Sequence, residues 1–163
     1  MMPGYFLDTN VFIQAQKVYY GMDIVPAFWE WLDKEALAGN IFSSSLVLEE
    51  LKKGDDELVA WAKEAHRKPF FEVPTASAQV IFAAISEYVI HHFKREEADA
   101  FLDGADPWLI AQAKAAGAVV VTMEAKVGPG SSKVKIPNIC EQFDVPYQNT
   151  FELLRALGAR FRL

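Results

Sequence analysis

The sequence has few of the residues that build disulfides and zinc sites. It contains a single cysteine, Cys140, and three histidines, His66, His91 and His92. One cysteine excludes an internal disulfide, and three scattered histidines lack the spacing of zinc ligands. We therefore expect a reduced, cytoplasmic protein.

Long apolar runs are also missing. No stretch approaches the roughly 18 to 20 residues that a membrane helix needs, and the apolar run from Ala115 to Met123 is interrupted by Gly117. The N-terminus has no basic region followed by an apolar one, so no signal peptide is expected. These patterns predict a soluble protein with no membrane partner.

Basic residues are outnumbered, with 16 Lys and Arg against 22 Asp and Glu and a formal net charge of −6. This balance argues against a protein that coats nucleic acid, because such binding depends largely on Lys and Arg. It does not exclude a nuclease. Carboxylates gathered around a divalent cation lower the net charge while making a site competent for phosphate.

The composition is that of a globular chain, with 163 residues of which 52% are hydrophobic. This length and apolar content suffice to bury a proper core and fit one domain better than two. Neither an internal repeat nor a linker is visible, so we predict a single domain over residues 1–163.

Short apolar or β-branched runs alternate with segments of helical spacing. The expected strands are Tyr5 to Leu7, Ile41 and Phe42, Phe70 to Val73, Ala118 to Thr122, and Val145 to Tyr147. The expected helices are Val25 to Ala38, one after Ser43–Ser45 through Lys53, one opened by Asp55–Glu57, Thr75 to His91, Lys94 to Leu102, Asp106 to Ala116, Pro137 to Phe143, and one capped by Thr150 through Leu157. This alternation predicts an α/β fold with a parallel sheet covered on both faces and a site at the carboxyl ends of the strands.

Two carboxylates follow predicted strands. Asp8 ends the first strand, and Glu124 lies two residues beyond the end of the predicted strand at Thr122. In a parallel sheet both project from the same edge. The alternatives are that Asp8 only caps a helix and that Glu124 is a solvated loop charge.

Glu50 is predicted to point inward. At about 100° per residue it falls between Leu46 and Val47 on the apolar arc of its helix, whereas Glu49 falls outside that arc. A buried carboxylate needs a metal ion, a basic partner or a raised pKa. A structural ion pair is therefore the alternative to a metal ligand.

Asp106 precedes Pro107 at the start of a predicted helix, where aspartate is a favourable N-cap in any protein. Asp103, three residues earlier, is a second candidate. Oxygen ligands without sulfur or imidazole suit hard divalent cations, and Mg²⁺ usually takes one or two carboxylates while keeping several waters. Such a site hydrolyses phosphodiesters with metal-activated water and without a covalent intermediate.

Four stretches resemble the PIN-domain family, in the family's order. They are Tyr-Phe-Leu-Asp8-Thr-Asn, Ser-Leu-Val-Leu-Glu-Glu50-Leu-Lys-Lys-Gly, Ala-Asp106-Pro-Trp-Leu-Ile-Ala and Gly-Ala-Val-Val-Val-Thr122-Met-Glu124. The sequence is most similar to an uncharacterised PIN-like subgroup and departs from the family pattern in having Glu124 where aspartate is commoner.

This resemblance implies a three-layer α/β/α sandwich with a central, mainly parallel sheet. It also implies a ribonuclease that uses Mg²⁺ or Mn²⁺, as in the VapC-type toxins of toxin–antitoxin pairs. Carried over, the catalytic and metal-binding acids are Asp8, Glu50, Asp106 and Glu124, and Asn10 and Thr122 support them. RNA is the expected substrate, and an antitoxin protein and a second copy of the chain are expected partners.

A flexible basic loop follows the fourth predicted strand. It spans Lys126 to Lys135, and Lys126, Lys133 and Lys135 are candidates for guiding RNA phosphates, with a plain solvated loop as the alternative.

Two other functions remain open. A PIN-like module without catalytic activity would bind RNA or a protein and use the acids only as caps and ion pairs. An aspartyl phosphatase would also begin with a strand-end aspartate, but it needs a second aspartate at the position of Asn10.

Overall fold

The centre of the molecule is a five-stranded parallel sheet, seen in a computed structural model that describes residues 3–163. The strand order is β3-β2-β1-β4-β5, and every pairing is parallel. The strands are β1 (Tyr5–Leu7), β2 (Ile41–Ser44), β3 (Phe71–Glu72), β4 (Val119–Val121) and β5 (Tyr147–Gln148). The predicted α/β fold with a parallel sheet is confirmed.

The two central strands are buried throughout. Each residue of β1 and β4 is buried, and the strands pair in register from Tyr5 opposite Val119 to Leu7 opposite Val121. Continuous apolar, β-branched sequence is what a strand covered on both faces requires. The residues that follow these two strands, Asp8 and Thr122, therefore lie at the same edge of the sheet.

Nine α-helices and two other helical segments connect the strands within residues 3–163. They are α1 (Thr9–Gln14), the π-helical η1 (Ala15–Tyr19), α2 (Pro26–Leu37), α3 (Ser45–Leu51), α4 (Glu57–Lys63), the 3₁₀-helical η2 (Ala65–Phe70), α5 (Ala76–His92), α6 (Arg95–Asp103), α7 (Asp106–Ala116), α8 (Ile136–Gln142) and α9 (Thr150–Ala156). Within the part of the chain that the structure describes, no helix has the length and apolarity needed to cross a bilayer.

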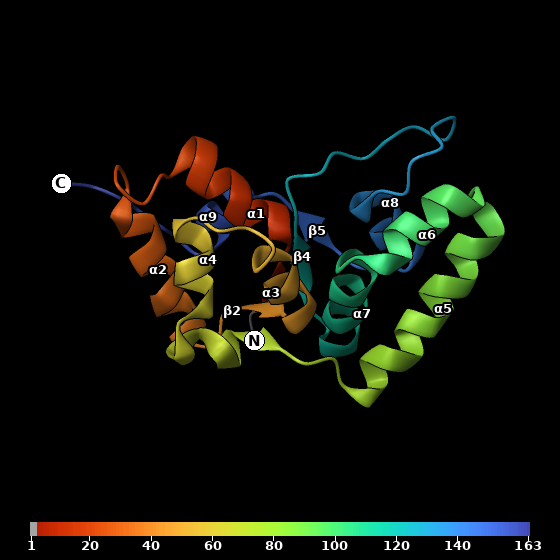
Figure 1. Ribbon diagram of the computed structural model, residues 1–163, viewed down its shortest axis with the longest axis horizontal. Helices are drawn as coiled ribbons and strands as arrows, with labels where there is room; N and C mark the ends of the chain where they lie inside the picture. The colour runs from red at the N-terminus through yellow and green to blue at the C-terminus, as the bar shows by residue number, and fades with distance from the viewer. Residues whose placement is uncertain (1–2) are drawn as a thin grey trace.

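The helices form layers around the sheet. α7 packs against β1, β2 and β4, and α5 packs on the outside of α7. α2 contacts β2, and Figure 1 shows α2 and α4 at one end of the molecule, α5 and α6 at the other, and α7 between α5 and the sheet. This arrangement is the expected three-layer sandwich.

Several boundaries differ from those that the sequence predicts. β2 extends through Ser43 and Ser44, because both pair with β3, and the Ser43 hydroxyl also donates to the Leu7 carbonyl at 2.7 Å. α3 consequently begins at Ser45 and ends at Leu51 instead of Lys53. The last helix is capped by Asn149, not by Thr150, since Asn149 forms a reciprocal capping box with Glu152.

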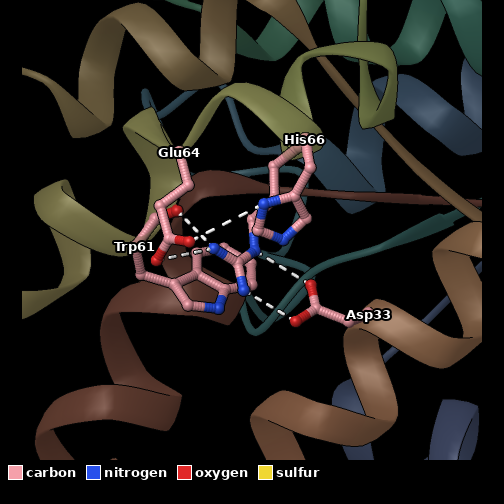
Figure 2. Close-up of polar contacts among 5 residues, drawn as sticks. Asp33, Trp61, Glu64 and His66 are labelled. Atoms are coloured by element: carbon pink, nitrogen blue, oxygen red, sulfur yellow. Dashed lines mark hydrogen bonds and ion pairs between the residues drawn. The ribbon is translucent and has the colours of Figure 1, made fainter.

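A group of paired charges lies on the side of the sheet where β2 and β3 begin (Figure 2). The Arg67 guanidinium donates two hydrogen bonds to Asp33, at 2.9 and 2.6 Å, and one to the Trp61 carbonyl at 2.9 Å. It also forms an ion pair with Glu64 at 3.1 Å and lies 4.3 Å from the centre of the Trp61 ring. These contacts, with His66 beside Glu64 at 3.7 Å, are called the Arg67 network below.

Candidate active site

Four acidic side chains converge at the carboxyl edge of the sheet, each carried by a different segment. Asp8 follows β1, Glu50 belongs to α3, Asp106 is the first residue of α7, and Glu124 lies three residues beyond β4. Their charges act on one another: Asp106 and Glu124 raise the pKa of Asp8, and Glu124 and Glu50 raise the pKa of Asp106. These four residues form the acidic cluster.

Asp8 is the most deeply buried member, with 2% of its surface exposed. The Thr122 hydroxyl donates to its Oδ2 at 2.9 Å, and its backbone N–H donates to the Val121 carbonyl at 2.9 Å. Burial raises the pKa of Asp8 well above its usual value, and the Asp106 charge raises it further. Asp8 is the N-cap residue of α1 by position, but its side chain makes no capping hydrogen bond. Capping alone therefore does not account for this aspartate.

Glu50 points toward the cluster and Glu49 does not. The Glu50 side chain is half-buried, and its Oε1 accepts a hydrogen bond from the Thr9 hydroxyl at 2.8 Å. Glu49 is exposed and pairs with Lys52 at 3.3 Å. The inward orientation that helical periodicity predicts for Glu50 is confirmed, and its partner is a hydroxyl instead of a basic side chain.

Asp106 is not the N-cap of its helix, which corrects the expectation from the sequence. The N-cap residue of α7 is Ala105, and Asp106 is the first helical residue, without a capping hydrogen bond. Burial, followed by the charges of Glu124 and Glu50, raises the pKa of Asp106 to about 7, and only the Lys135 charge lowers it. Asp106 thus faces other acids where an ordinary capping residue would face backbone N–H groups.

Hydrogen bonds fix the segment after β4 beside the cluster. The Thr122 hydroxyl accepts from the Glu124 N–H at 3.1 Å, and the Asn10 Oδ1 accepts from the Met123 N–H at 3.0 Å. The Glu124 carboxylate accepts from the Ile136 N–H at 2.9 Å. Asn10 and Thr122 therefore hold the segment that carries Glu124.

The remaining candidates separate in space. Asp103 is exposed at the end of α6, and its charge is not among those that shift the pKa of Asp8 or Asp106. Lys126 pairs with Glu141 at 2.7 Å and Lys133 with Glu97 at 3.2 Å. Lys135 alone of the three lysines acts on Asp106.

Sequence reasoning missed Thr9, which orients Glu50, and did not distinguish Lys135 from the other loop lysines. Thr9 directly follows Asp8, and no local pattern relates it to Glu50. The signal that it could reach Glu50 would have been the parallel pairing of β1 with β2, which places the starts of α1 and α3 side by side.

The donor chemistry of the cluster fits a hydrated Mg²⁺ or Mn²⁺ ion. Within residues 3–163, no three His, Cys, Asp or Glu side chains lie close enough to hold a metal ion by themselves. Mg²⁺, however, commonly takes one or two carboxylates and keeps its other ligands as water. Four mutually repelling carboxylates with raised pKa values at Asp8 and Asp106 are a set that a cation would stabilise. An open, water-containing site fits, and a closed protein cage does not.

The fold is similar to that of several solved complexes. The structure of FitAB bound to an IR36 DNA fragment gives a TM-score of 0.54 at 20% identity, over 89% of this chain and 94% of the other. FitAcB from Neisseria gonorrhoeae gives 0.53 at 19% identity, over 90% and 98%. VapBC2 from Rickettsia felis bound to a DNA fragment from their promoter gives 0.50 at 16% identity, over 89% and 97%. The protein therefore has the PIN-like fold, as the sequence resemblance predicts.

The family itself is defined by sequence. The model described as "Domain of unknown function (DUF4411)" matches residues 5–161, and the chain belongs to this family. No curated protein matches the chain.

Proposed function

We propose that this protein is a metal-dependent endoribonuclease whose acidic cluster binds Mg²⁺ or Mn²⁺ and hydrolyses RNA phosphodiester bonds. The observation that carries the proposal is the convergence of four carboxylates from separate segments, with the pKa of Asp106 raised to about 7. Strongly shifted carboxylates gathered at one edge of a parallel sheet are typical of a functional site.

We assign different roles to the four acids of the acidic cluster. Asp8 and Asp106 are the members with raised pKa values, and we assign them direct contact with the cation, with Glu50 and Glu124 completing the site through water. A bound Mg²⁺ or Mn²⁺ would polarise the phosphate and lower the pKa of the attacking water. Deprotonated Asp106 is the form that can bind, so its proton must leave first.

Hydroxyl groups orient the carboxylates. Thr122 donates to Asp8 and Thr9 donates to Glu50, which leaves at least one oxygen of each carboxylate free of that hydrogen bond. Lys135 begins the segment whose next N–H binds Glu124, and its charge is favourable toward Asp106. We assign Lys135 the role of attracting the phosphate that approaches the cluster.

We further propose that the protein acts in the cytoplasm as the toxin of a toxin–antitoxin pair. This rests on the fold shared with FitAB and VapBC, which are complexes by their names. The carboxylates of the acidic cluster suit an inhibitory segment that carries arginine. Expression with its neighbouring gene tests the idea: copurification of a second protein supports it, and purification alone contradicts it.

A module without catalytic activity is the second candidate. It is favoured by the absence, within residues 3–163, of three side chains close enough to hold a metal. The aspartyl phosphatase has less support, because Asn10 takes the place of the needed second acid and its Oδ1 is bound to the Met123 N–H.

The decisive experiment is Mn²⁺ calorimetry on three samples: the wild type, Asp8→Asn combined with Glu50→Gln, and Glu49→Gln as a matched control. Glu49 is adjacent in sequence to Glu50 but exposed and paired with Lys52. Circular dichroism establishes that each variant is folded, and single-stranded RNA cleavage is measured on the same samples. Metal binding and cleavage in the wild type and control only would support the proposal. A wild type that binds no Mn²⁺ at about millimolar concentration would favour the module without catalytic activity.

A further inference from the structure

A cavity separate from the acidic cluster lies under the loop that follows β4. It has a volume of about 480 Å³ and is bounded by the end of α5, the start of α6 and the loop. Tyr88, His92, Phe93, Lys94, Ser131 and Lys133 are among its lining residues. This cavity is called the loop pocket. Figure 1 shows the segment after β4 running out toward α6 before it returns to α8.

One wall of the loop pocket is aromatic. The Tyr88 and His92 rings stack with centroids 4.2 Å apart and an interplanar angle of 20°. Tyr88 is supported from the side by Phe143 at 5.8 Å and Phe93 at 6.4 Å, and the His92 Nδ1 is 2.8 Å from the Tyr88 carbonyl oxygen. Such fixed aromatic rings are platforms on which unpaired bases stack without strict sequence preference.

The rim of the loop pocket carries positive charge and hydroxyl groups. Lys94 forms no ion pair with any residue of the described range 3–163. Lys133 pairs with Glu97 at 3.2 Å, with its side chain 62% exposed. An exposed ion pair contributes little to stability, so a phosphate can compete for this lysine. The side chains of Ser131 and Ser132 add exposed hydroxyl groups.

The loop pocket is connected directly to the acidic cluster. The loop leaves from Glu124 and returns to it, because the Ile136 N–H donates to the Glu124 carboxylate at 2.9 Å. Asn138 fixes the base of the loop through bonds to the Val127 N–H at 3.0 Å and carbonyl at 2.8 Å. Val127 is three residues from Glu124, which limits their separation to about 11 Å. A nucleic-acid strand at the cluster can therefore continue into the loop pocket.

A second cavity, apolar and of similar volume, lies beside the Arg67 network and lacks these properties. It has a volume of about 490 Å³, and its single arginine is already bound to Asp33, Glu64 and the Trp61 carbonyl. Among its lining residues in the described range 3–163, no lysine or unpaired arginine is available for a phosphate. The cavity lies where β2 begins, at the opposite end of the strand from the acidic cluster.

We propose that the loop pocket binds one unpaired nucleotide of the RNA substrate, with its base against the Tyr88 and His92 rings and its phosphate between Lys94 and Lys133. The identity of the ligand as RNA rests on the proposed function, whereas the pocket itself is independent of metal. Because a base must be unpaired to enter the loop pocket, the proposal predicts a preference for single-stranded over double-stranded RNA.

The test measures binding of a single-stranded RNA that contains 2-aminopurine, with EDTA present so that no cleavage occurs. Lys94→Gln combined with Lys133→Gln should weaken binding about tenfold and reduce the slope of log affinity against log salt by about 1.4. The control, Lys34→Gln combined with Lys63→Gln, removes the same charge from exposed lysines of α2 and α4. It should bind like the wild type.

Fluorescence quenching tests the contact between the RNA base and the aromatic rings separately. Binding to the wild type should quench the 2-aminopurine fluorescence, and the exposed His92→Ala variant should lose most of that quenching. A duplex of the same sequence should bind more weakly than the single strand. Equal binding by single strand and duplex, or equal loss in the control variant, would overturn the proposal.

A failure of the proposed function is distinguishable from a failure of the loop pocket. Hydrolysis of bis(p-nitrophenyl) phosphate with Mn²⁺ requires the acidic cluster but is too small a substrate to reach the pocket. We expect the Lys94 and Lys133 variant to keep this hydrolysis and to raise KM for RNA. If the wild type does not hydrolyse the small substrate, the nuclease proposal fails, and the EDTA binding data still decide the pocket.

Discussion

Two groups of carboxylates, at opposite ends of the central strands, have opposite surroundings. At the side where β2 and β3 begin, Asp33 and Glu64 are both paired with Arg67, which also covers the Trp61 ring (Figure 2). At the carboxyl edge, the four acids of the acidic cluster face one another, and the Lys135 charge lowers the pKa of Asp106.

The difference lies in what each arrangement stabilises. In the Arg67 network every charge has a partner, so the contacts hold α2, α4 and η2 together and need no ligand. In the acidic cluster burial and repulsion disfavour the charged state of Asp8 and Asp106. The proposed cation would offset this repulsion, whereas the Arg67 network needs none.

The largest expected effect is on catalysis. Asp106→Asn should lower metal-dependent RNA cleavage by more than about 100-fold, because it removes a proposed metal ligand. Single-turnover cleavage at saturating Mn²⁺ measures this. Glu49→Gln is the control and should retain wild-type activity. Cleavage that survives in Asp106→Asn would exclude Asp106 from the reaction.

The next effect is on stability. Arg67→Met should lower the free energy of unfolding by about 1 to 2 kcal/mol, since it removes the hydrogen bonds of a buried guanidinium to Asp33 and to the Trp61 carbonyl. Urea denaturation measures this, and Mn²⁺ affinity at the distant acidic cluster should stay unchanged. The control is Arg95→Met, whose exposed pair with Asp99 contributes little. Equal losses of unfolding free energy in both variants would show that the buried Arg67 contributes no more than an exposed ion pair.

A smaller effect follows from the raised pKa of Asp106, about 7. Protonated Asp106 cannot bind a cation, so Mn²⁺ affinity should rise about tenfold between roughly pH 6 and pH 8. Calorimetry across this range gives the pH at the midpoint of the change in Mn²⁺ affinity. Lys135→Gln removes the charge that lowers this pKa and should move the midpoint to higher pH. Affinity that does not vary with pH over this range would contradict the raised pKa.

The smallest expected effect is a gain in stability from Asp106→Asn, the same variant that should lose most activity. Because the folded pKa of Asp106 is raised, its charge destabilises the fold; this penalty is absent below the unfolded pKa, near 3.8, and grows as pH rises to about 7. Without metal, Asp106→Asn should therefore be more stable than the wild type by about 1 kcal/mol near pH 8 and by nothing near pH 3.5. Urea denaturation in EDTA at both pH values checks the sign. A variant that is less stable near pH 8 would show that Asp106 is structural.

Much of the fold could be predicted because it depends on local pattern. The apolar runs at Tyr5–Leu7 and Val119–Val121 are buried strands, and Gly117, with φ of 64°, ends α7 as its position predicts. The predicted N-cap of the last helix, Thr150, was wrong. Asn149 caps this helix, because it exchanges hydrogen bonds with Glu152 in a capping box. The single-domain organisation, the metal and the RNA substrate stay predictions.

The sequence by itself determined which carboxylates stand at strand ends or on apolar helix faces, since periods of 2.0 and 3.6 residues are properties of the chain. It could not decide that Asp106 faces other acids instead of capping α7, that Thr9 reaches Glu50, or that Lys135 differs from Lys126 and Lys133. Those facts depend on residues that lie far apart in the sequence, such as Thr9 and Glu50, which are 41 positions apart. Only the packing of the sheet and helices sets such distances, and with them the charges that each acid experiences.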